Sequence, residues 1–435
     1  MNTTARDAQV PPSLTERWVV HCILWTYAYY LLGALYVVGP VLAWSLAAHH
    51  LRHQGLRDLS LTAWAWIAGM GMMLVVVVVA HADFDLGLGT TLKSCIGWAK
   101  GWALMALFIL IGFGRIRIEV LSRAVCWLGV QTLLLFPLLV LARVLHLPSE
   151  LYVSPLSIIG GPGPEYFAVE LYSLNAESGT ARWRLFAPWA PAMGLIMSCL
   201  VMIALQERRA ALRWTGIAGM LLAILASGSR LGLLALPVVV AFTQMWRRLD
   251  QPALYLGLSP MFLLAGLLHQ GLADLIDDFT SRFHGARADS SRVRATLGRI
   301  AVHRWETEAY WWGHGTVEPG PHLVEHMPIG SHHTWYGLLF VKGVMGLVSL
   351  AVPMLMTLGV LFRHGRHSRA GQAAFGVLLV LGFYTFSENL EMLAYLYWPA
   401  LVVLGMGLRD AAHRSIGLRA PAAQTIDRAT PVPLT

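Results

Sequence analysis

Charged side chains are scarce in this sequence. They make up 13% of its 435 residues, whereas a soluble globular protein carries about 25%. Surface that faces water needs charge, so the deficit argues against a large soluble domain and for surface that faces lipid. The net charge of +8 does not indicate a nucleic-acid partner, because the basic residues lie in short loops between apolar runs rather than on one long face.

Cysteine is scarce as well, with four residues in the whole chain. Cys22, Cys95, Cys126 and Cys199 all lie inside apolar runs, and no two of them form a C-x-x-C pair. The spacing therefore argues against a disulfide framework and against a cysteine-based metal or redox site. We also expect no cleavable signal peptide, because the first apolar run is long and lacks a small-residue cleavage motif.

Long apolar runs, by contrast, are abundant, and 56% of the residues are hydrophobic. A membrane-spanning helix needs about 20 apolar residues. The runs predict an all-α fold, a polytopic transmembrane bundle of eleven or twelve spans, and the count depends on whether the first run breaks at Gly39-Pro40. The expected spans are 18–48, 59–80, 95–113, 124–142, 190–205, 212–226, 231–246, 252–268, 336–362, 370–385 and 393–408.

The connections between these runs alternate in character. Short basic loops, such as 49–57 and 206–213, alternate with longer or more acidic ones, and short basic loops mark the cytoplasmic side. We therefore expect the two long loops in the periplasm and a cytoplasmic, disordered tail. The expected organisation is an N-terminal tail (1–17), transmembrane helices (18–268) with an external loop (143–189), a large, partly helical periplasmic loop (269–335), C-terminal transmembrane helices (336–408) and the tail (409–435).

One arginine falls at a turn between two apolar runs that are short for full spans. The turn reads Ser227-Gly228-Ser229-Arg230, which places Arg230 at or below the outer membrane surface. A charge inside the membrane is expensive and by default indicates a functional site. The alternative is that Arg230 only extends its side chain to the interface.

The large loop is rich in arginine, although it is expected outside the membrane. External loops tend to avoid arginine, and the planar guanidinium donates two parallel hydrogen bonds that suit phosphate. The cluster therefore indicates an anionic ligand; the alternative is a solvated loop whose arginines pair with Asp289, Glu306 and Glu308. Its arginines are Arg282, Arg287, Arg292, Arg294, Arg299 and Arg304.

Three segments follow one another in a recognisable order. Ser227-Gly228-Ser229-Arg230-Leu231 opens a span with S-x-S-R, and Trp312-Gly313-His314-Gly315 places a G-x-G in the large loop. His332-His333-Thr334-Trp335 ends that loop just before a span, and Gly343 and Gly346 follow it. In this order and topology the segments resemble the O-antigen polymerase and O-antigen ligase superfamily, in which asparagine is usual where His333 stands.

The resemblance implies a metal-independent, inverting glycosyltransferase that uses no cofactor. Its donor would be a glycan linked to undecaprenyl diphosphate and its acceptor a sugar hydroxyl, at the periplasmic face of the bacterial inner membrane. It places Arg230 and His332 in catalysis, because cations stabilise charge on the diphosphate and a base takes the acceptor's proton. The residues expected to bind diphosphate or glycan are Ser229, Arg292, Arg294, Arg299, His314 and His333. Any one of the three arginines could be the second diphosphate ligand.

The acceptor separates two versions of this chemistry. A polysaccharide polymerase, which the Ser331–Trp335 stretch slightly favours, lengthens a glycan on its lipid carrier, whereas a ligase moves the finished glycan to the lipid A core. A chain-length regulator or a flippase would be a partner of either enzyme. A third interpretation, a lipid-linked glycan flippase, predicts charges along many spans and repeat symmetry between the halves, and the sequence has neither.

Histidines are frequent near the end of the large loop, but their spacing does not predict a metal site. The run His322-Leu323-Val324-Glu325-His326 fits the H-x-x-E-H pattern of some zinc proteases, which requires one helical face. Pro321 and Pro328 leave room for barely one turn, and a third ligand is not evident, so we expect no metal.

Three further charged residues lie near the expected outer surface. Lys100, toward the outer end of the third span, either reaches the interface or faces the same cavity as the arginines. Glu388 and Glu391 flank the last outer turn, where the sequence predicts solvation. Either carboxylate could instead bind sugar hydroxyls.

Overall fold

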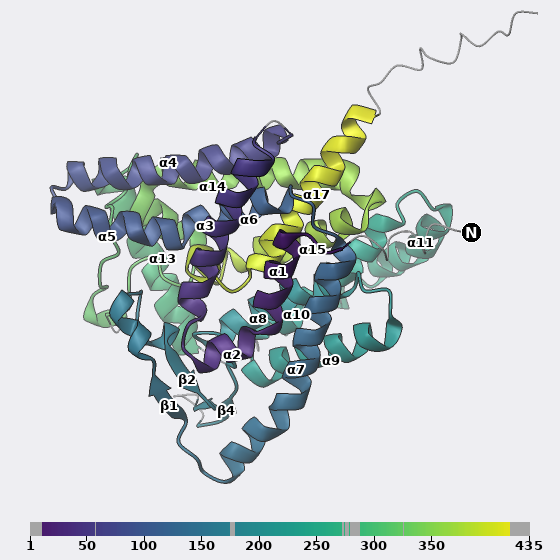
Figure 1. The fold of residues 1–435 in the computed structure, drawn as a ribbon, viewed down its shortest axis with the longest axis horizontal. Helices are drawn as coiled ribbons and strands as arrows, with labels where there is room; N and C mark the ends of the chain where they lie inside the picture. Colours follow the sequence, from purple (N-terminus) through teal and green to yellow (C-terminus); the bar gives the residue numbers. More distant parts are fainter. Residues whose placement is uncertain are drawn as a thin grey trace, which may run out of the picture.

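Helices make up nearly all of the regular structure in the computed structural model (Figure 1). The expected all-α, polytopic helical fold is confirmed, and two small two-stranded sheets are the exception. The structure describes residues 11–56, 58–174, 179–271, 274, 278, 288–324 and 326–417.

The first apolar run forms three helices instead of one long span. They are α1 (Leu14–Leu24), α2 (Thr26–Leu31) and α3 (Leu35–His53). The chain turns between α2 and α3 at Gly33, whose φ of +62° is a conformation that glycine adopts without strain. The break therefore lies at Gly33, and of the two alternatives left open for this run a break at Gly39-Pro40 is wrong, because both residues lie inside α3.

The following helices overlap the expected spans, but the segment expected at 95–113 begins eight residues earlier, at Gly87. They are α4 (Leu61–Asp83), α5 (Gly87–Lys100), α6 (Trp102–Gly112) and α7 (Ile118–Val144). α5 and α6 form one apolar segment divided at Gly101, where a Cβ would lie 3.2 Å from the carbonyl oxygen of Glu391. α4 and α5 lie side by side and extend beyond the rest of the bundle (Figure 1).

The expected external loop 143–189 contains the β-structure, which the sequence did not predict. Its strands are β1 (Glu150–Val153), β2 (Ala168–Glu170), β3 (Ser173–Leu174) and β4 (Ala181–Arg182). β1 pairs antiparallel with β2, and β3 pairs antiparallel with β4. Two 3-10 helices, η1 (Pro155–Ile159) and η2 (Pro164–Tyr166), lie between β1 and β2. The loop is therefore a folded cap rather than an irregular connection.

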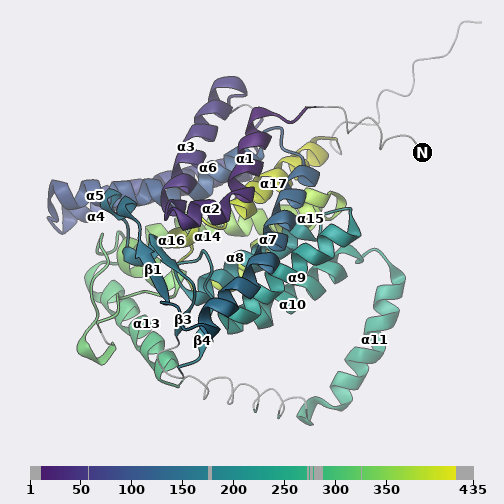
Figure 2. The same ribbon diagram turned by 60° about the horizontal axis from the view of Figure 1, so that its bottom comes forward.

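The middle of the chain returns to apolar helices. They are α8 (Ala190–Ala204), α9 (Ala210–Ser227), α10 (Arg230–Arg247) and α11 (Pro252–Leu267). Nearly every residue of α8 is buried, so α8 runs through the centre of the bundle. α11 buries none of its residues and stands apart from the other helices (Figure 2).

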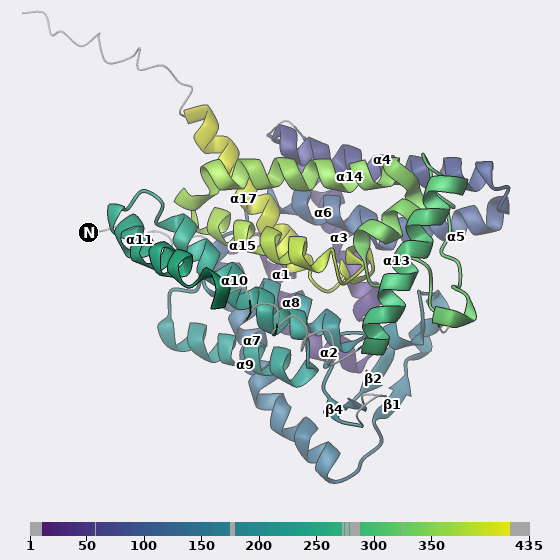
Figure 3. The same cartoon turned by 180° about the vertical axis from the view of Figure 1, so that it is seen from behind.

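The rest of the chain carries the large loop and the last apolar helices. These elements are α13 (Ala288–Glu308), η3 (His322–Val324), α14 (Thr334–His364), η4 (Gly365–His367), α15 (Arg369–Tyr384), α16 (Leu390–Leu393) and α17 (Trp398–Gly417). The loop is partly helical, as expected, because α13 lies within it. α13 packs against the beginning of α14, and α14 lies along α4 (Figure 3).

Five helical segments among the described residues are long and apolar enough to cross a membrane. They are Leu61–Asp83, Gly87–Gly112, Ile118–Val144, Ala210–Ser227 and Thr334–His367. Three shorter apolar helices, α8, α11 and α15, accompany them. The fold is thus that of a membrane protein whose spans differ in length.

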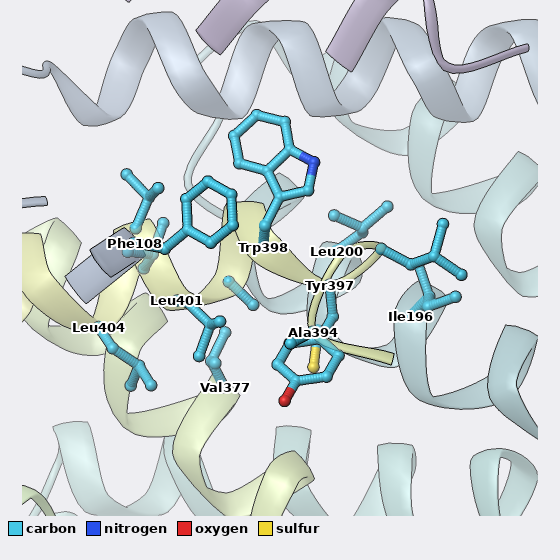
Figure 4. Close-up of a cluster of buried hydrophobic side chains, with 14 of the residues drawn as sticks. Phe108, Ile196, Leu200, Val377, Ala394, Tyr397, Trp398, Leu401 and Leu404 are labelled. Carbon is cyan, nitrogen blue, oxygen red and sulfur yellow. The ribbon is translucent and has the colours of Figure 1, made fainter. Parts of the chain in front are cut away.

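The core lies where α6, α8, α15 and α17 meet. Phe108 of α6 stacks on Trp398 of α17, with the ring centroids 5.3 Å apart. Ile196 and Leu200 of α8 and Val377 of α15 close the same cluster (Figure 4). This core holds the turn between α15 and α17 in place.

α14 is broken at Gly343, which has the non-helical angles φ 59° and ψ −162°. In a continuous helix, Val344 and Met345 would donate hydrogen bonds to the carbonyl groups of Phe340 and Val341. Here the amides of Val344 and Met345 donate instead to the carbonyl oxygens of Tyr310 and Trp311, at 3.0 and 3.2 Å.

The large loop also supplies the donors that the break requires. The amides of His314 and Gly315 donate to the carbonyl oxygens of Phe340 and Val341, each at 2.9 Å. We call these four hydrogen bonds between residues 310–315 and 340–345 the α14 bracket. Unpaired backbone groups cost several kcal/mol in lipid, so the bracket allows a break that lipid alone would not tolerate.

Replacing Gly343 tests the bracket. A Cβ at this position would lie 2.4 Å from the carbonyl oxygen of Trp311, and the positive φ is strained for other residues. Gly343→Ala should therefore lower the free energy of unfolding by about 1–3 kcal/mol or more. The loss of stability is measured by heating both proteins in detergent and using size-exclusion chromatography to determine how much folded protein remains at each temperature.

The matched control is Gly359→Ala in the same helix. A Cβ there meets no atom within 4 Å, so its unfolding temperature should equal or exceed that of the wild type. Equal unfolding temperatures for Gly343→Ala and Gly359→Ala would show that the break is not under steric constraint.

Candidate functional site

The expected turn between two apolar runs forms as a tight helix-to-helix connection. Gly228 ends α9 in the left-handed conformation, with φ +63°. Ser229 caps α10, and its Oγ accepts a hydrogen bond from the amide of Gly232 at 3.3 Å. Arg230 is the first residue of α10 and is half-buried. The S-x-S-R segment thus places the arginine at a helix N-terminus, where the helix dipole is positive.

The segment His332-His333-Thr334 leads into α14, whose first residue is Thr334. His333 is the cap: its Nδ1 accepts a hydrogen bond from the amide of Tyr336 at 3.2 Å, and its ring stacks on that of Tyr336 with centroids 3.8 Å apart. The backbone amide of His333 donates to Oδ1 of Asn389 at 3.0 Å. His333, which was expected to bind substrate, is therefore a side chain that caps a helix.

His332 lies in the left-handed region, with φ +61°, which is uncommon for a residue with a side chain. Burial lowers the pKa of His332 to about 4, and the nearby charge of Arg294 lowers it further in the same direction. The imidazole is therefore neutral at neutral pH. A strained backbone held by its surroundings is typical of functional positions.

α13 distinguishes among the three arginines of the large loop. Val293, Leu297 and Ala301 are buried and lie on the face of α13 that packs inward. Arg292 and Arg299 are exposed, whereas Arg294 is half-buried. Arg294 also lies close enough to His332 and Glu388 for its charge to lower the pKa of both groups. The structure therefore brings Arg294, of these three, to His332.

Glu388 is a component of the site for which the sequence predicted solvation, with binding of sugar hydroxyls as the alternative. Its side chain is 1% exposed, so the expected solvation of this residue is wrong. Oε2 accepts a hydrogen bond from the indole nitrogen of Trp189 at 2.8 Å, and Oε1 is buried without a partner among the described residues. Burial raises the pKa of Glu388 to about 7, although the hydrogen bond from Trp189 and the charge of Arg294 oppose that shift.

Glu391, three residues further on, has a similar environment. Burial raises its pKa to about 7, a shift that a backbone hydrogen bond and the charge of Lys342 oppose. Its Oε2 is buried without a partner among the described residues. Lys342 lies at the break of α14 and is 6% exposed. One buried carboxyl group, that of Glu388, and one half-buried carboxyl group, that of Glu391, therefore occupy the turn between α15 and α17, contrary to the solvation expected there.

The turn between α15 and α17 connects the separate segments of the site. On one side, the hydroxyl of Tyr384 lies 3.3 Å from Oγ of Ser229. On the other side, the amide of Thr334 donates to the carbonyl of Thr385 at 2.8 Å, and the hydroxyl of Thr334 donates to the carbonyl of Glu388 at 2.6 Å. Residues 384–391 thus hold the Ser229-Arg230 turn and the start of α14 against the same short segment.

Comparisons with known proteins add no relative. No protein-family model matches the chain, and neither a curated protein nor a solved structure does. The chemistry of the site therefore rests on its own residues.

His314, expected to bind substrate, has structural partners instead. One ring nitrogen, Nε2, is 2.9 Å from the carboxylate of Glu308, and the other, Nδ1, is 3.0 Å from the carbonyl oxygen of Phe340. Its ring stacks on that of Phe340 and is 2% exposed. Hydrogen bonds from Arg304 and His314 lower the pKa of Glu308 to about 2. His314 therefore fastens the loop to α14 at the bracket.

The remaining candidates are also placed by the structure. Among the described residues, no group of three His, Cys, Asp or Glu side chains is arranged to hold a metal ion. The rings of His322 and His326 meet edge to face at 5.7 Å, and Glu325 lies outside the described residues. Lys100 donates from Nζ to the carbonyl of Gly160 at 2.9 Å. It therefore points toward the folded cap formed by loop 143–189.

The raised pKa of Glu388 predicts a pH-dependent stability. An acid whose pKa is higher in the folded state than in the unfolded state destabilises the fold as it ionises, here between about pH 4.5 and pH 7. Glu388→Gln removes this penalty, so it should be more stable than the wild type at pH 8.5, by on the order of 3 kcal/mol, and should not be at pH 5.

Thermal unfolding of both proteins across this pH range measures the difference. Glu306→Gln is the matched control, because Glu306 is exposed, and it should show no such trend. A stability difference for Glu388→Gln that does not change with pH would refute a raised pKa at this carboxyl group.

Proposed function

We propose that this chain is an inverting, metal-independent glycosyltransferase of the O-antigen polymerase and ligase type. Its donor is a glycan linked to undecaprenyl diphosphate, its acceptor is a sugar hydroxyl, and its site faces the periplasm from the bacterial inner membrane. The observation that carries the proposal is that the charge of Arg294 acts on both His332, before α14, and Glu388, in the turn between α15 and α17, and lowers the pKa of each. A cation, a neutral imidazole and a buried carboxyl group suit displacement of a diphosphate.

In the proposed reaction, the acceptor oxygen forms a bond to the anomeric carbon of the donor sugar. The bond between that carbon and the diphosphate oxygen breaks, and its electron pair leaves with the lipid diphosphate. Arg230 and Arg294 stabilise the developing charge, because a guanidinium can donate two parallel hydrogen bonds to phosphate oxygens. The position of Arg230 at the N-terminus of α10 adds the positive end of the helix dipole.

His332 is the proton acceptor in this proposal. Its lowered pKa keeps the ring neutral, so a nitrogen lone pair is available when the acceptor hydroxyl attacks. His333 is less suited to this role, since its Nδ1 already accepts the hydrogen bond that caps α14. The strained backbone of His332 fixes the ring before substrate binds, which reduces the reorganisation that the reaction requires.

The same chemistry serves a polymerase and a ligase, which differ only in the acceptor. The glycan left on the lipid carrier in a deletion strain separates them. Single repeat units on the carrier support a polymerase, and long stranded chains support a ligase.

Lysine substitutions test the role assigned to the two arginines. Lysine keeps the charge but cannot donate the paired hydrogen bonds. One charge-assisted hydrogen bond contributes about 1.5–3 kcal/mol, so Arg230→Lys and Arg294→Lys should each lower kcat by roughly tenfold to a hundredfold. Turnover of purified protein with lipid-linked donor measures this at matched levels of folded protein.

Arg299→Lys is the control, because Arg299 is exposed and donates to the hydroxyl of Thr296 on its own helix. Its kcat should remain within about twofold of the wild type, a change of less than roughly 0.5 kcal/mol. Wild-type turnover by both Arg230→Lys and Arg294→Lys would contradict the proposal that these arginines stabilise the leaving diphosphate.

The orientation can be tested by cysteine labelling. Val317 of the large loop is 60% exposed, so Val317→Cys should react with an impermeant thiol reagent in intact spheroplasts. Gln54→Cys, in a short basic loop on the opposite side, should react only after lysis. Both variants need a Cys95→Ser background, since Cys95 is the native cysteine that is not fully buried. The reverse labelling pattern would overturn a periplasmic site.

A further inference from the structure

The ends of α10 and α14 meet on the side of the bundle opposite the proposed site. Both helices begin at that site, so their last turns lie at the far end of the bundle. There the indole nitrogen of Trp246 donates to the carbonyl oxygen of Phe362 at 3.1 Å. This hydrogen bond holds the two helix ends side by side. We call residues 246–250 and 362–367 the α10–α14 corner.

The α10–α14 corner carries more positive than negative charge. Asp250 is the one acidic residue in these two stretches of sequence, and its carboxylate pairs with Arg366 at 2.9 Å. Arg247, Arg248 and Arg363 are exposed. Arg248 and Arg363 form no hydrogen bond or ion pair with another described residue. The side chains of these two arginines are therefore available to an anion from outside the chain.

Exposed aromatic rings lie beside and beneath these arginines. Phe362 is 47% exposed, and Phe242, one helical turn before Trp246, is 38% exposed. Both rings pack on Phe375 of α15, with centroids 6.1 and 6.2 Å from it, and Trp246 stacks on the same ring at 4.2 Å. α15 lies between α10 and α14 (Figure 3). The surface thus changes from cationic to aromatic within about one helical turn.

A cationic surface that borders an apolar one is complementary to a phospholipid. A guanidinium donates paired hydrogen bonds to phosphate oxygens, and basic pockets between the ends of membrane helices bind anionic headgroups. Acyl chains pack on exposed apolar rings at the depth just below the headgroups. A soluble phosphate compound would use the arginines and leave the exposed rings of Phe242 and Phe362 without a partner, so the combination favours a lipid.

We propose that the α10–α14 corner binds the headgroup of an anionic phospholipid, whose phosphate is held by Arg248 and Arg363. One acyl chain of this lipid lies along the rings of Phe242 and Phe362. The lipid contacts the ends of both helices and so adds to the hydrogen bond that Trp246 makes between them. The site does not depend on the glycosyltransferase function, because it uses none of the residues assigned to the reaction.

Replacing both arginines tests the site. The full chain is purified in a neutral detergent, and native mass spectrometry counts the lipids bound as phosphatidylglycerol or phosphatidylcholine with the same acyl chains is added. Phosphatidylglycerol should bind the wild type about tenfold more tightly, since the choline cation opposes the arginines. Arg248→Gln/Arg363→Gln should raise the Kd for phosphatidylglycerol roughly tenfold to thirtyfold and that for phosphatidylcholine much less.

The matched control removes two arginines elsewhere on the same surface. Arg52 and Arg209 are exposed and lie in the short basic loops 49–57 and 206–213. Arg52→Gln/Arg209→Gln therefore loses the same net charge without touching the corner, and its Kd for phosphatidylglycerol should stay within about twofold of the wild type. Equal weakening by the two double variants would overturn the site, because lipid binding would then follow net charge alone.

Two further results would also overturn the lipid assignment. Equal affinity of the wild type for phosphatidylglycerol and phosphatidylcholine would show that the headgroup charge is not recognised. Inorganic phosphate should displace no more phosphatidylglycerol than sodium chloride does at the same ionic strength, because screening acts equally in both. Stronger displacement by phosphate would show that Arg248 and Arg363 bind a soluble phosphate compound instead of a lipid.

Discussion

The hydrogen bonds of the α14 bracket are the constraint on which the site depends. Backbone groups in a membrane have no water to pair with, so a broken span is stable only where protein supplies every missing partner. Residues 310–315 supply them at Gly343, and this fixes the large loop to α14. The start of α14 and α13 are fixed with it, which brings His332 and Arg294 together. A backbone requirement thus sets the geometry of the charged groups.

Much of the site was predictable because its signals are local. Gly228 followed by Ser229 is a helix end and a helix cap in adjacent positions, so the turn that presents Arg230 could be read from the chain. α13 carries a signal as well: Val293, Leu297 and Ala301 repeat at helical spacing, and Arg294 lies next to that stripe. The sequence did not decide which of the three arginines is the second diphosphate ligand, because the inward-facing side of α13 had not been assigned.

Other parts depend on partners distant in the chain. Glu388 is buried because Trp189, 199 residues earlier, donates to it, and no local pattern gives that contact. The strands of the folded cap are two to four residues long, too short for a periodic signal. The break at Gly33 in place of Gly39-Pro40 has a similar cause. Proline usually ends or kinks a helix, which favoured a break at Pro40. Pro40 is instead accommodated within α3, and the chain turns at Gly33, which adopts the positive φ that the turn requires.

The α14 bracket also bears on how the protein is made. His314 and Phe340 are 26 residues apart, so the bracket closes a short loop and costs little chain entropy. The loop precedes α14 in the chain and therefore leaves the ribosome first. When Phe340 and Val341 follow, the amides of His314 and Gly315 are already available to them. The partners of the two carbonyl groups are thus synthesised before the span that needs them.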